Sequence, residues 1–402
     1  MQRQPRSLMG QVITLIGLLA LAAAFYLRAA SNLQRIDYRN SNFVFFWLAG
    51  RMVVSGENPY DSGGWLAAHD ANSVNWRPNR IFPYPLPLAF MVAPLGLLDL
   101  SDAYMAWQLV SEVLIAAAVW ILLKRLREPR HVRMFVPLVL GLLFFGPVYL
   151  SLQIGALGAF TLAIVVAAIH ALDSRRMLLG GILLSLTLLK PPQGLPLVLL
   201  ACVWLLSRRE WKSLLGLGAG AVLLALIGML RDPLWPSKFA TAGQAVLDRT
   251  LGVQSNALGL AFLACSGDNQ CAWLLGGGAA VVLLLVTGAY LHRRSASLTS
   301  WEAFNLIIPT AFVATPYLWS YDQILYIVPV VWIVLALINK TNSYLPAFGF
   351  MIVLVVVSLL ALLTQANTRS DVTSLLTTFI VVACVVALRS GGRSAGAAAR
   401  EA

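Results

Sequence analysis

Carboxylates and aromatic side chains gather in one long polar segment, which runs from Arg35 to Tyr84 between two apolar blocks. The segment holds several carboxylates, among them Asp37, Glu57, Asp61 and Asp70, and its aromatic side chains could hold a ligand. A segment of about fifty residues is long for a connector, and its aromatic and proline content argues against disorder. We therefore expect it to form one wall of an active site, with later loops forming the others.

Composition places this segment beside a membrane. Of the 402 residues, 59% are hydrophobic and only 11% are charged, and the mean hydropathy is +0.78. Polar residues are therefore too few to cover a soluble fold. The formal charge of +12 comes mostly from short basic clusters between apolar runs, which is typical of cytoplasmic turns and not of a nucleic-acid surface. We predict an all-α polytopic membrane protein that contacts membrane lipid and no nucleic acid.

Charge also indicates which apolar runs cross the membrane. If residues 81–98 crossed, the basic cluster at 124–133 would lie outside, and the prolines within the run argue against a regular spanning helix. We therefore expect residues 30–100 to form an outer loop that carries short surface helices. Residues 257–265 are too few to cross and predict a second surface or re-entrant piece.

The remaining pattern predicts a single transmembrane domain over residues 1–390, with about twelve helices, and a flexible cytoplasmic tail over 391–402. Both ends of the chain are then cytoplasmic. The predicted spans are 8–26, 103–123, 134–150, 156–172, 177–190, 195–207, 213–230, 272–291, 302–315, 323–338, 345–364 and 372–388.

This topology collects unusual polar residues on the outer face. Lys190 could either snorkel from a helix end or pair with a ligand phosphate, and Asp322 could cap a helix or meet a partner in the membrane. The aromatic residues at 317–321 fit an interfacial belt as well as a binding site, and Gln153 and Asn256 could satisfy the backbone of broken helices. The outer-face candidates are Asp37, Asn42, Arg80, Tyr84, Gln153, Lys190, Gln193, Asn256, Tyr317, Tyr321 and Asp322.

The cysteines and the absent motifs limit the chemistry further. Cys265 and Cys271 flank a predicted outer loop and could form a disulfide at an oxidising face. The sequence contains no phosphate-binding GxxxxGK[ST] or GxGxxG motif, no HExxH motif and no zinc-type cysteine–histidine spacing. We expect neither a metal ion nor a nucleotide cofactor.

Six stretches, in order along the chain, resemble glycosyltransferase family 87, a family of polyprenol-phosphate-mannose-dependent α-mannosyltransferases within the membrane GT-C superfamily. Singly they are weak signals, but as an ordered set they are moderately specific. The stretches are SNFVFFWLAGRMVVSGENPYD (41–61), FPYPLPLAFMVAPLGLL (82–98), LQIGALGAFTLA (152–163), GGILLSLTLLKPPQGLPLVLL (180–200), QSNALGL (254–260) and TPYLWSYDQILYIVP (315–329).

The resemblance implies a GT-C-like fold and transfer of a hexose, mannose by analogy, with inversion. The donor would be a polyprenyl-phosphate sugar and the acceptor a glycolipid or glycan at the extracytoplasmic face of the plasma membrane. Asp37 would be the base, with Asp322 as the other carboxylate, and a phosphate would be held by Lys190, Arg80 and tyrosine hydroxyls. Other substrate contacts would come from Asn42, Tyr84, Gln153, Asn256, Tyr317 and Tyr321.

One position departs from the family pattern. The carboxylate that usually precedes an aromatic residue by four positions in the first loop is replaced here by Asn42, in the run NFVFF. Asparagine cannot accept a proton, so either Asp37 or Asp322 takes over this role, or the chain is a non-catalytic member of the family. A transporter or flippase of lipid-linked sugars is the alternative from a different class. It would line a path through the membrane instead of gathering polar groups at one face.

Overall fold

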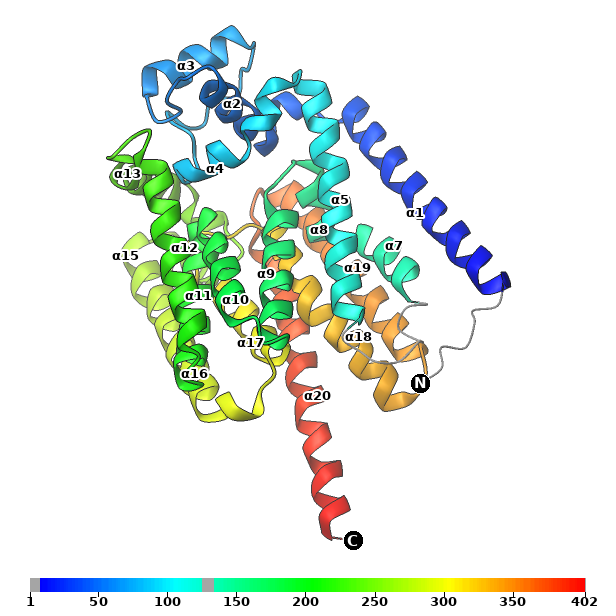
Figure 1. Cartoon of the computed structure of the whole chain (residues 1–402). Coiled ribbons are helices and arrows are strands. Elements are labelled where there is room, and N and C mark those ends of the chain that lie inside the picture. Colours follow the sequence, from blue (N-terminus) through cyan, green and yellow to red (C-terminus); the bar gives the residue numbers. More distant parts are fainter. Residues whose placement is uncertain (1–7, 125–133, 402) are drawn as a thin grey trace.

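The computed structural model describes residues 8–124 and 134–401, with the side chains of 15–124 and 134–389. Within these residues every regular element is a helix, as predicted. Figure 1 shows a bundle of long helices with a small cap, which contains α2, α3 and α4, at one end. The first helix begins, and the last one ends, at the end of the bundle away from the cap.

Among the described residues, seven helices are long and apolar enough to cross a membrane, and they coincide with seven of the twelve predicted spans. The longest of them, residues 269–297, combines α15 (Asn269–Ala272), a π-helical turn and α16 (Gly278–Arg294). The other six contain α1 (Leu8–Arg35), α5 (Leu100–Lys124), α12 (Trp211–Met229), α18 (Ile327–Thr341), α19 (Leu345–Thr368) and α20 (Leu375–Glu401).

The other predicted spans fall on shorter or bent helices. Two helices, α7 (Phe135–Leu143) and α8 (Gly146–Gln153), meet at a 68° bend and make an eighth span if they are one broken helix. Twelve spans therefore remain a prediction. The other shorter helices of the bundle are α9 (Gly158–Asp173), α10 (Met177–Ser185), its continuation η3 (Leu186–Leu189), α11 (Pro191–Ser207) and α17 (Ser300–Ala314). Residues 257–265, expected at the surface, contain the short helix α14 (Ala257–Ala264).

The last helix includes most of the predicted tail, whose flexibility stays a prediction. The backbone of α20 stays helical as far as Glu401, which includes the stretch where a flexible tail was predicted.

The cap is built around an apolar helix in the middle of the polar segment. Nine of the thirteen residues of α2 (Asn42–Val54) are buried, and its aromatic rings pack against those of α3 (Ser62–Ala71) and the following loop. The run 81–98 does not cross the bundle. It forms α4 (Leu86–Met91) and the short η2 (Ala93–Leu97). A Cβ atom on Gly96 of η2 would lie 2.2 Å from the Arg51 nitrogen, so only glycine permits this contact with α2.

Three helical paths of the bundle are broken. One break is the α7–α8 bend, the second is the turn from η3 through Lys190 into α11, and the third is the loop 315–319 before η7 (Ser320–Tyr326). Prolines at 191 and 192 begin α11, where their missing amide protons cost nothing. Irregular backbone at membrane depth is tolerated where it is buried in protein or lines a cavity. These breaks therefore mark where a site could lie.

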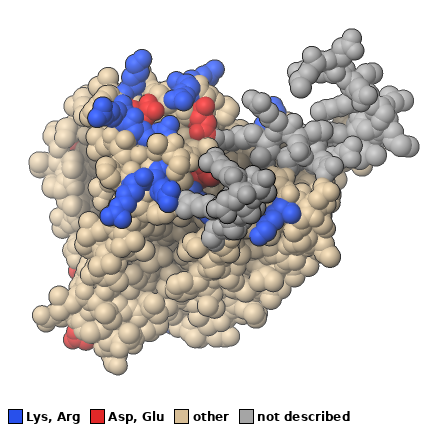
Figure 2. Space-filling model, turned by 90° about the horizontal axis from the view of Figure 1, so that it is seen from below, with Lys and Arg blue, Asp and Glu red and all other residues tan. Residues whose placement is uncertain are grey.

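The opposite end of the bundle is basic. Figure 2, seen from that end, shows lysine and arginine side chains grouped on one part of the surface. They belong to the turns between helices, for example Arg175, Arg208 and Arg209. Basic turns therefore lie together at the end of the bundle away from the cap.

Candidate active site

A cavity of about 810 Å³ lies where the cap meets the end of α8 and two of these breaks, the turn through Lys190 and the loop 315–319. Its walls come from two cap segments, from the ends of α8 and α11, from α13 (Trp235–Thr250) and from the loop that follows α17. Most of the lining is apolar or aromatic, with a few polar groups between the rings, as in many sites for small molecules. Five predicted site residues line it: Asn42, Tyr84, Lys190, Tyr317 and Tyr321.

A buried ion pair forms the centre of the cavity wall. The Lys190 ammonium donates a hydrogen bond to the Asp322 carboxylate, and the two side chains are 5% and 0% exposed. The second carboxylate oxygen accepts from the Trp319 backbone nitrogen at 3.2 Å. The Lys190 nitrogen also lies 5.2 Å from the centre of the Tyr321 ring. Two residues 132 positions apart in the chain therefore form one charged unit, of which Lys190 lines the cavity.

Three tyrosines surround this pair. Burial raises the pKa of Tyr84 well above its usual value, and the neighbouring Tyr317 and the Asp322 carboxylate raise it further. Burial also raises the pKa of Tyr317, against the opposing effect of its hydrogen bond with Trp319. Asn42 and Tyr321 both line the cavity. At neutral pH Tyr84 and Tyr317 therefore stay protonated, and their hydroxyls are hydrogen-bond donors, not bases.

A second layer holds the loop that carries these groups. The backbone nitrogen of Leu318 donates to the Gln254 side chain at 3.0 Å. The backbone nitrogen of Ser320 donates to the carboxylate of Asp371, a residue in the turn between α19 and α20. Burial raises the pKa of Asp371 to about 7, against the opposing hydrogen bond from Ser320. The position of Asp322 thus depends on contacts from two other loops.

The family of the chain follows from a comparison with protein-family models. The model of glycosyltransferase family 87 matches residues 82–316, which is more than half of the sequence. The chain belongs to glycosyltransferase family 87. The resemblance seen in the sequence is thereby confirmed, and the chain is a membrane glycosyltransferase. Neither the curated proteins nor the solved structures include a match to it.

The glycosyltransferase places its two candidate bases differently. Asp322 lies directly behind the cavity wall, through its contacts with Lys190 and Trp319. Asp37 does not line the cavity. It precedes the short helical turn Tyr38–Asn40 and accepts a hydrogen bond from Asn40, which does line it.

Four other predicted residues also lie outside the cavity lining of this glycosyltransferase. Gln193 is buried in the first turn of α11. Arg80 is exposed. Gln153 ends α8, where its backbone oxygen accepts from the Tyr104 hydroxyl at 3.0 Å. Asn256 is buried and caps α14 by accepting from the Gly259 nitrogen at 2.8 Å. With this contact Asn256 satisfies a backbone group at the start of a short helix, which is one of the two roles that the sequence suggested for it. Catalytic or substrate-binding roles for these residues remain predictions.

Sequence reasoning missed one charged residue of the site. Arg249, near the end of α13, lines the cavity. A single arginine in a polar stretch of the sequence gives no signal, because the fold alone brings α13 over the cavity. No aspartate or glutamate is among the described residues that line it, but Asp322 forms hydrogen bonds with two lining residues, Lys190 and Trp319.

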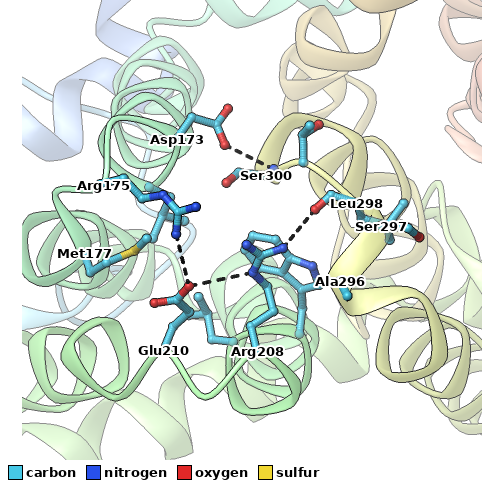
Figure 3. A pocket seen from close by; sticks show the side chains of 13 residues that line it. Asp173, Arg175, Met177, Arg208, Glu210, Ala296, Ser297, Leu298 and Ser300 are labelled. Carbon is cyan, nitrogen blue, oxygen red and sulfur yellow. Dashed lines mark hydrogen bonds and ion pairs between the residues drawn. The ribbon is translucent and has the colours of Figure 1, made fainter.

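The glycosyltransferase also has a smaller hollow, of about 390 Å³, at the basic end of the bundle. Figure 3 shows acidic and basic side chains alternating around it. Arg208 lies 3.8 Å from Glu210 and donates to the backbone oxygen of Ser295 at 2.9 Å, while the Ser300 nitrogen donates to Asp173 at 3.2 Å. These charged groups bind one another and tie three inter-helix turns together. We therefore regard the hollow as a structural contact between turns and not as the candidate active site.

Proposed function

We propose that the protein transfers a hexose, mannose by analogy with its family, from a polyprenyl-phosphate donor to a lipid-linked or cell-envelope acceptor. The observation that carries the proposal is the convergence of Lys190, Asp322, Asn42 and the three tyrosines on one cavity between cap and bundle. A donor with an apolar tail and a charged phosphate needs an apolar groove that ends in cationic and hydroxyl groups. The described lining offers both.

We place the reaction at the outer face of the plasma membrane. The basic turns lie at the end of the bundle away from the cap, and basic turns stay in the cytoplasm. The disulfide between Cys265 and Cys271, with a Cα–Cα distance of 5.9 Å, supports this orientation. It precedes the helix that ends in the basic residues His292–Arg294, so it lies toward the other side, where thiols oxidise.

In this mechanism the acceptor hydroxyl attacks the anomeric carbon of the donor sugar, and the bond from that carbon to the phosphate oxygen breaks. The configuration at the carbon inverts. The hydroxyl proton passes to a carboxylate, and polyprenyl phosphate leaves with the bonding electron pair. Lys190 and the tyrosine hydroxyls stabilise the leaving phosphate.

The geometry supports Asp322 over Asp37 as the base. Asp322 contacts two residues that line the cavity, whereas Asp37 contacts only the side chain of Asn40 there. A phosphate that binds Lys190 competes with Asp322 for the ammonium group. Donor binding would therefore free the carboxylate that must accept the proton.

Sugar transfer in isolated membranes tests the function and the base together. The assay follows radiolabelled mannose from polyprenyl-phosphate-mannose into lipid, with the wild type, Asp322→Asn, Asp37→Asn and Asn42→Asp. We expect transfer by the wild type, and a loss of at least a hundredfold in Asp322→Asn, the low end of the contribution from a general base. Loss in Asp37→Asn alone would assign the base to Asp37. Transfer that appears only in Asn42→Asp would show that the natural chain lacks this chemistry.

A further inference from the structure

We propose that Arg249 on α13 binds the phosphate of the lipid substrate, so that α13 is a working part of the substrate site. The inference rests on the proposed function. It assigns a phosphate contact to a helix that the sequence analysis left without a role.

The first argument is the charge of the cavity. Among the described lining residues only Lys190 and Arg249 are cationic, and none is acidic. The charge of Lys190 is balanced by Asp322 in the wall behind it. Arg249 meets no carboxylate among the described residues. Its contacts are two backbone oxygens, of Ala245 at 2.9 Å and of Pro78 at 3.2 Å. The cavity thus keeps one uncompensated positive charge, and it comes from Arg249.

The second argument is the unused hydrogen-bonding capacity of this side chain. A guanidinium group has five N–H donors, and those two backbone contacts use only two of them. The side chain is exposed, and its charge acts on the buried hydroxyl of Tyr317 in the same cavity. A planar donor group beside a phenol hydroxyl suits phosphate oxygens, which arginine binds through paired hydrogen bonds.

The third argument is the packing of α13 itself. No residue of this helix is buried, although one face turns a row of residues toward the cavity. That row is only partly covered and consists of Phe239, Ala242, Val246, Leu247 and Thr250. An apolar chain in the cavity would cover the row and complete the packing of the helix. A lipid whose phosphate lies at the level of Arg249 would both cover the apolar row of α13 and bind the guanidinium group.

The test measures binding of undecaprenyl phosphate to the purified full-length protein, with undecaprenol as the uncharged probe. Arg249→Gln removes the charge, and Arg249→Lys keeps it without the planar donor group. The matched control is Arg231→Gln. Arg231 also meets a backbone oxygen of the cap, that of Glu57 at 3.2 Å, but it does not line the cavity.

We expect the wild type to bind undecaprenyl phosphate about tenfold more tightly than Arg249→Gln, since a charge-assisted hydrogen bond contributes about this much. Binding of undecaprenol should not change, Arg249→Lys should be intermediate, and Arg231→Gln should equal the wild type. Equal binding of the phosphate by the wild type and Arg249→Gln would overturn the proposal. So would an equal loss for both probes, because that result indicates a damaged helix and not a phosphate contact.

Two further arms identify the phosphate and separate this inference from the proposed function. Phosphatidylglycerol and inorganic phosphate are tested as competitors. An Arg249-dependent competition by phosphatidylglycerol would support the contact and assign it to a bilayer or acceptor lipid. Sugar transfer is measured in parallel. If undecaprenyl phosphate binding depends on Arg249 but the wild type transfers no sugar, the phosphate contact is supported and the proposed transferase function is refuted. Transfer with an unchanged KM for the donor in Arg249→Gln refutes the inference while the function stands.

Discussion

Removal of one partner from the Lys190–Asp322 pair should destabilise the protein more than removal of both. Both side chains are almost fully buried, so Lys190→Met leaves a buried carboxylate without its cation. Loss of one partner from a buried pair costs about 3–5 kcal/mol. We expect the lower figure, about 3 kcal/mol, because Asp322 retains the hydrogen bond from the Trp319 nitrogen. This value corresponds to more than a hundredfold in the unfolding equilibrium.

The matched variants are Asp322→Asn and the double variant Lys190→Met/Asp322→Asn. The single Asp322→Asn should also cost about 3 kcal/mol, since it leaves a buried ammonium group unpaired. The double variant has no buried charge, and its asparagine oxygen can still accept from Trp319. Its cost should be about 2 kcal/mol, that of an amide without an acceptor. The double variant is then about 4 kcal/mol more stable than the sum of the single losses predicts.

Unfolding by SDS in mixed micelles gives these free energies, with the fraction of folded protein followed by circular dichroism. Additive losses in the double variant would refute the reasoning, because they would mean that the two charges do not interact in the folded protein. All three variants should lose sugar transfer. A stable double variant without transfer would separate the chemical role of the pair from its structural role.

Two further results follow from the fold. The pKa of Asp371 is raised to about 7 in the folded protein, so the protonated form of this residue favours folding. This stability is present below the ordinary pKa of 3.8 and is lost as the pH rises through 7. Thermal unfolding between pH 4 and 8 should show this fall in the wild type, and a fall of the same size in Asp371→Asn would contradict the assignment. Gly96→Ala should destabilise the cap by about 1–3 kcal/mol or more, because its Cβ would clash with the backbone of α2; in thermal unfolding Gly218→Ala, where no atom lies within 4 Å, should show no such loss, and equal midpoints for the two variants would count against the close contact.

The sequence predicted the helical class, the family and much of the site, because these depend on composition and on ordered motifs. Lys190, Tyr84, Tyr317 and Tyr321 were selected as outer-face polar residues, and the structure brings them to one cavity. The disulfide between Cys265 and Cys271 is confirmed. The alternation of apolar runs and basic clusters in the chain indicated that each of these residues lies toward the outer face.

Other features depend on contacts between distant segments and could not be read in this way. Asp322 and Lys190 were each chosen for their own position, and nothing in either stretch shows that they pair. The apolar run in α2 was treated as part of a polar loop, although it forms the core of the cap. Arg249 was overlooked because only the fold places α13 at the cavity. The roles of these residues depend on contacts with distant segments, and such contacts leave no pattern in the neighbouring sequence.

The shortness of several bundle helices has a consequence for the surrounding bilayer. The helices α9, α11 and α17 contain 16, 17 and 15 residues, so at 1.5 Å per residue they are about 22–26 Å long. The hydrocarbon layer of a typical membrane is about 30 Å thick. On the exposed face of α11, which carries Leu195 and Leu199, lipid must thin to avoid hydrophobic mismatch. Leu195 also lines the cavity, so this local thinning would lower the headgroup layer toward its opening and shorten the distance over which a lipid phosphate must be drawn into the protein.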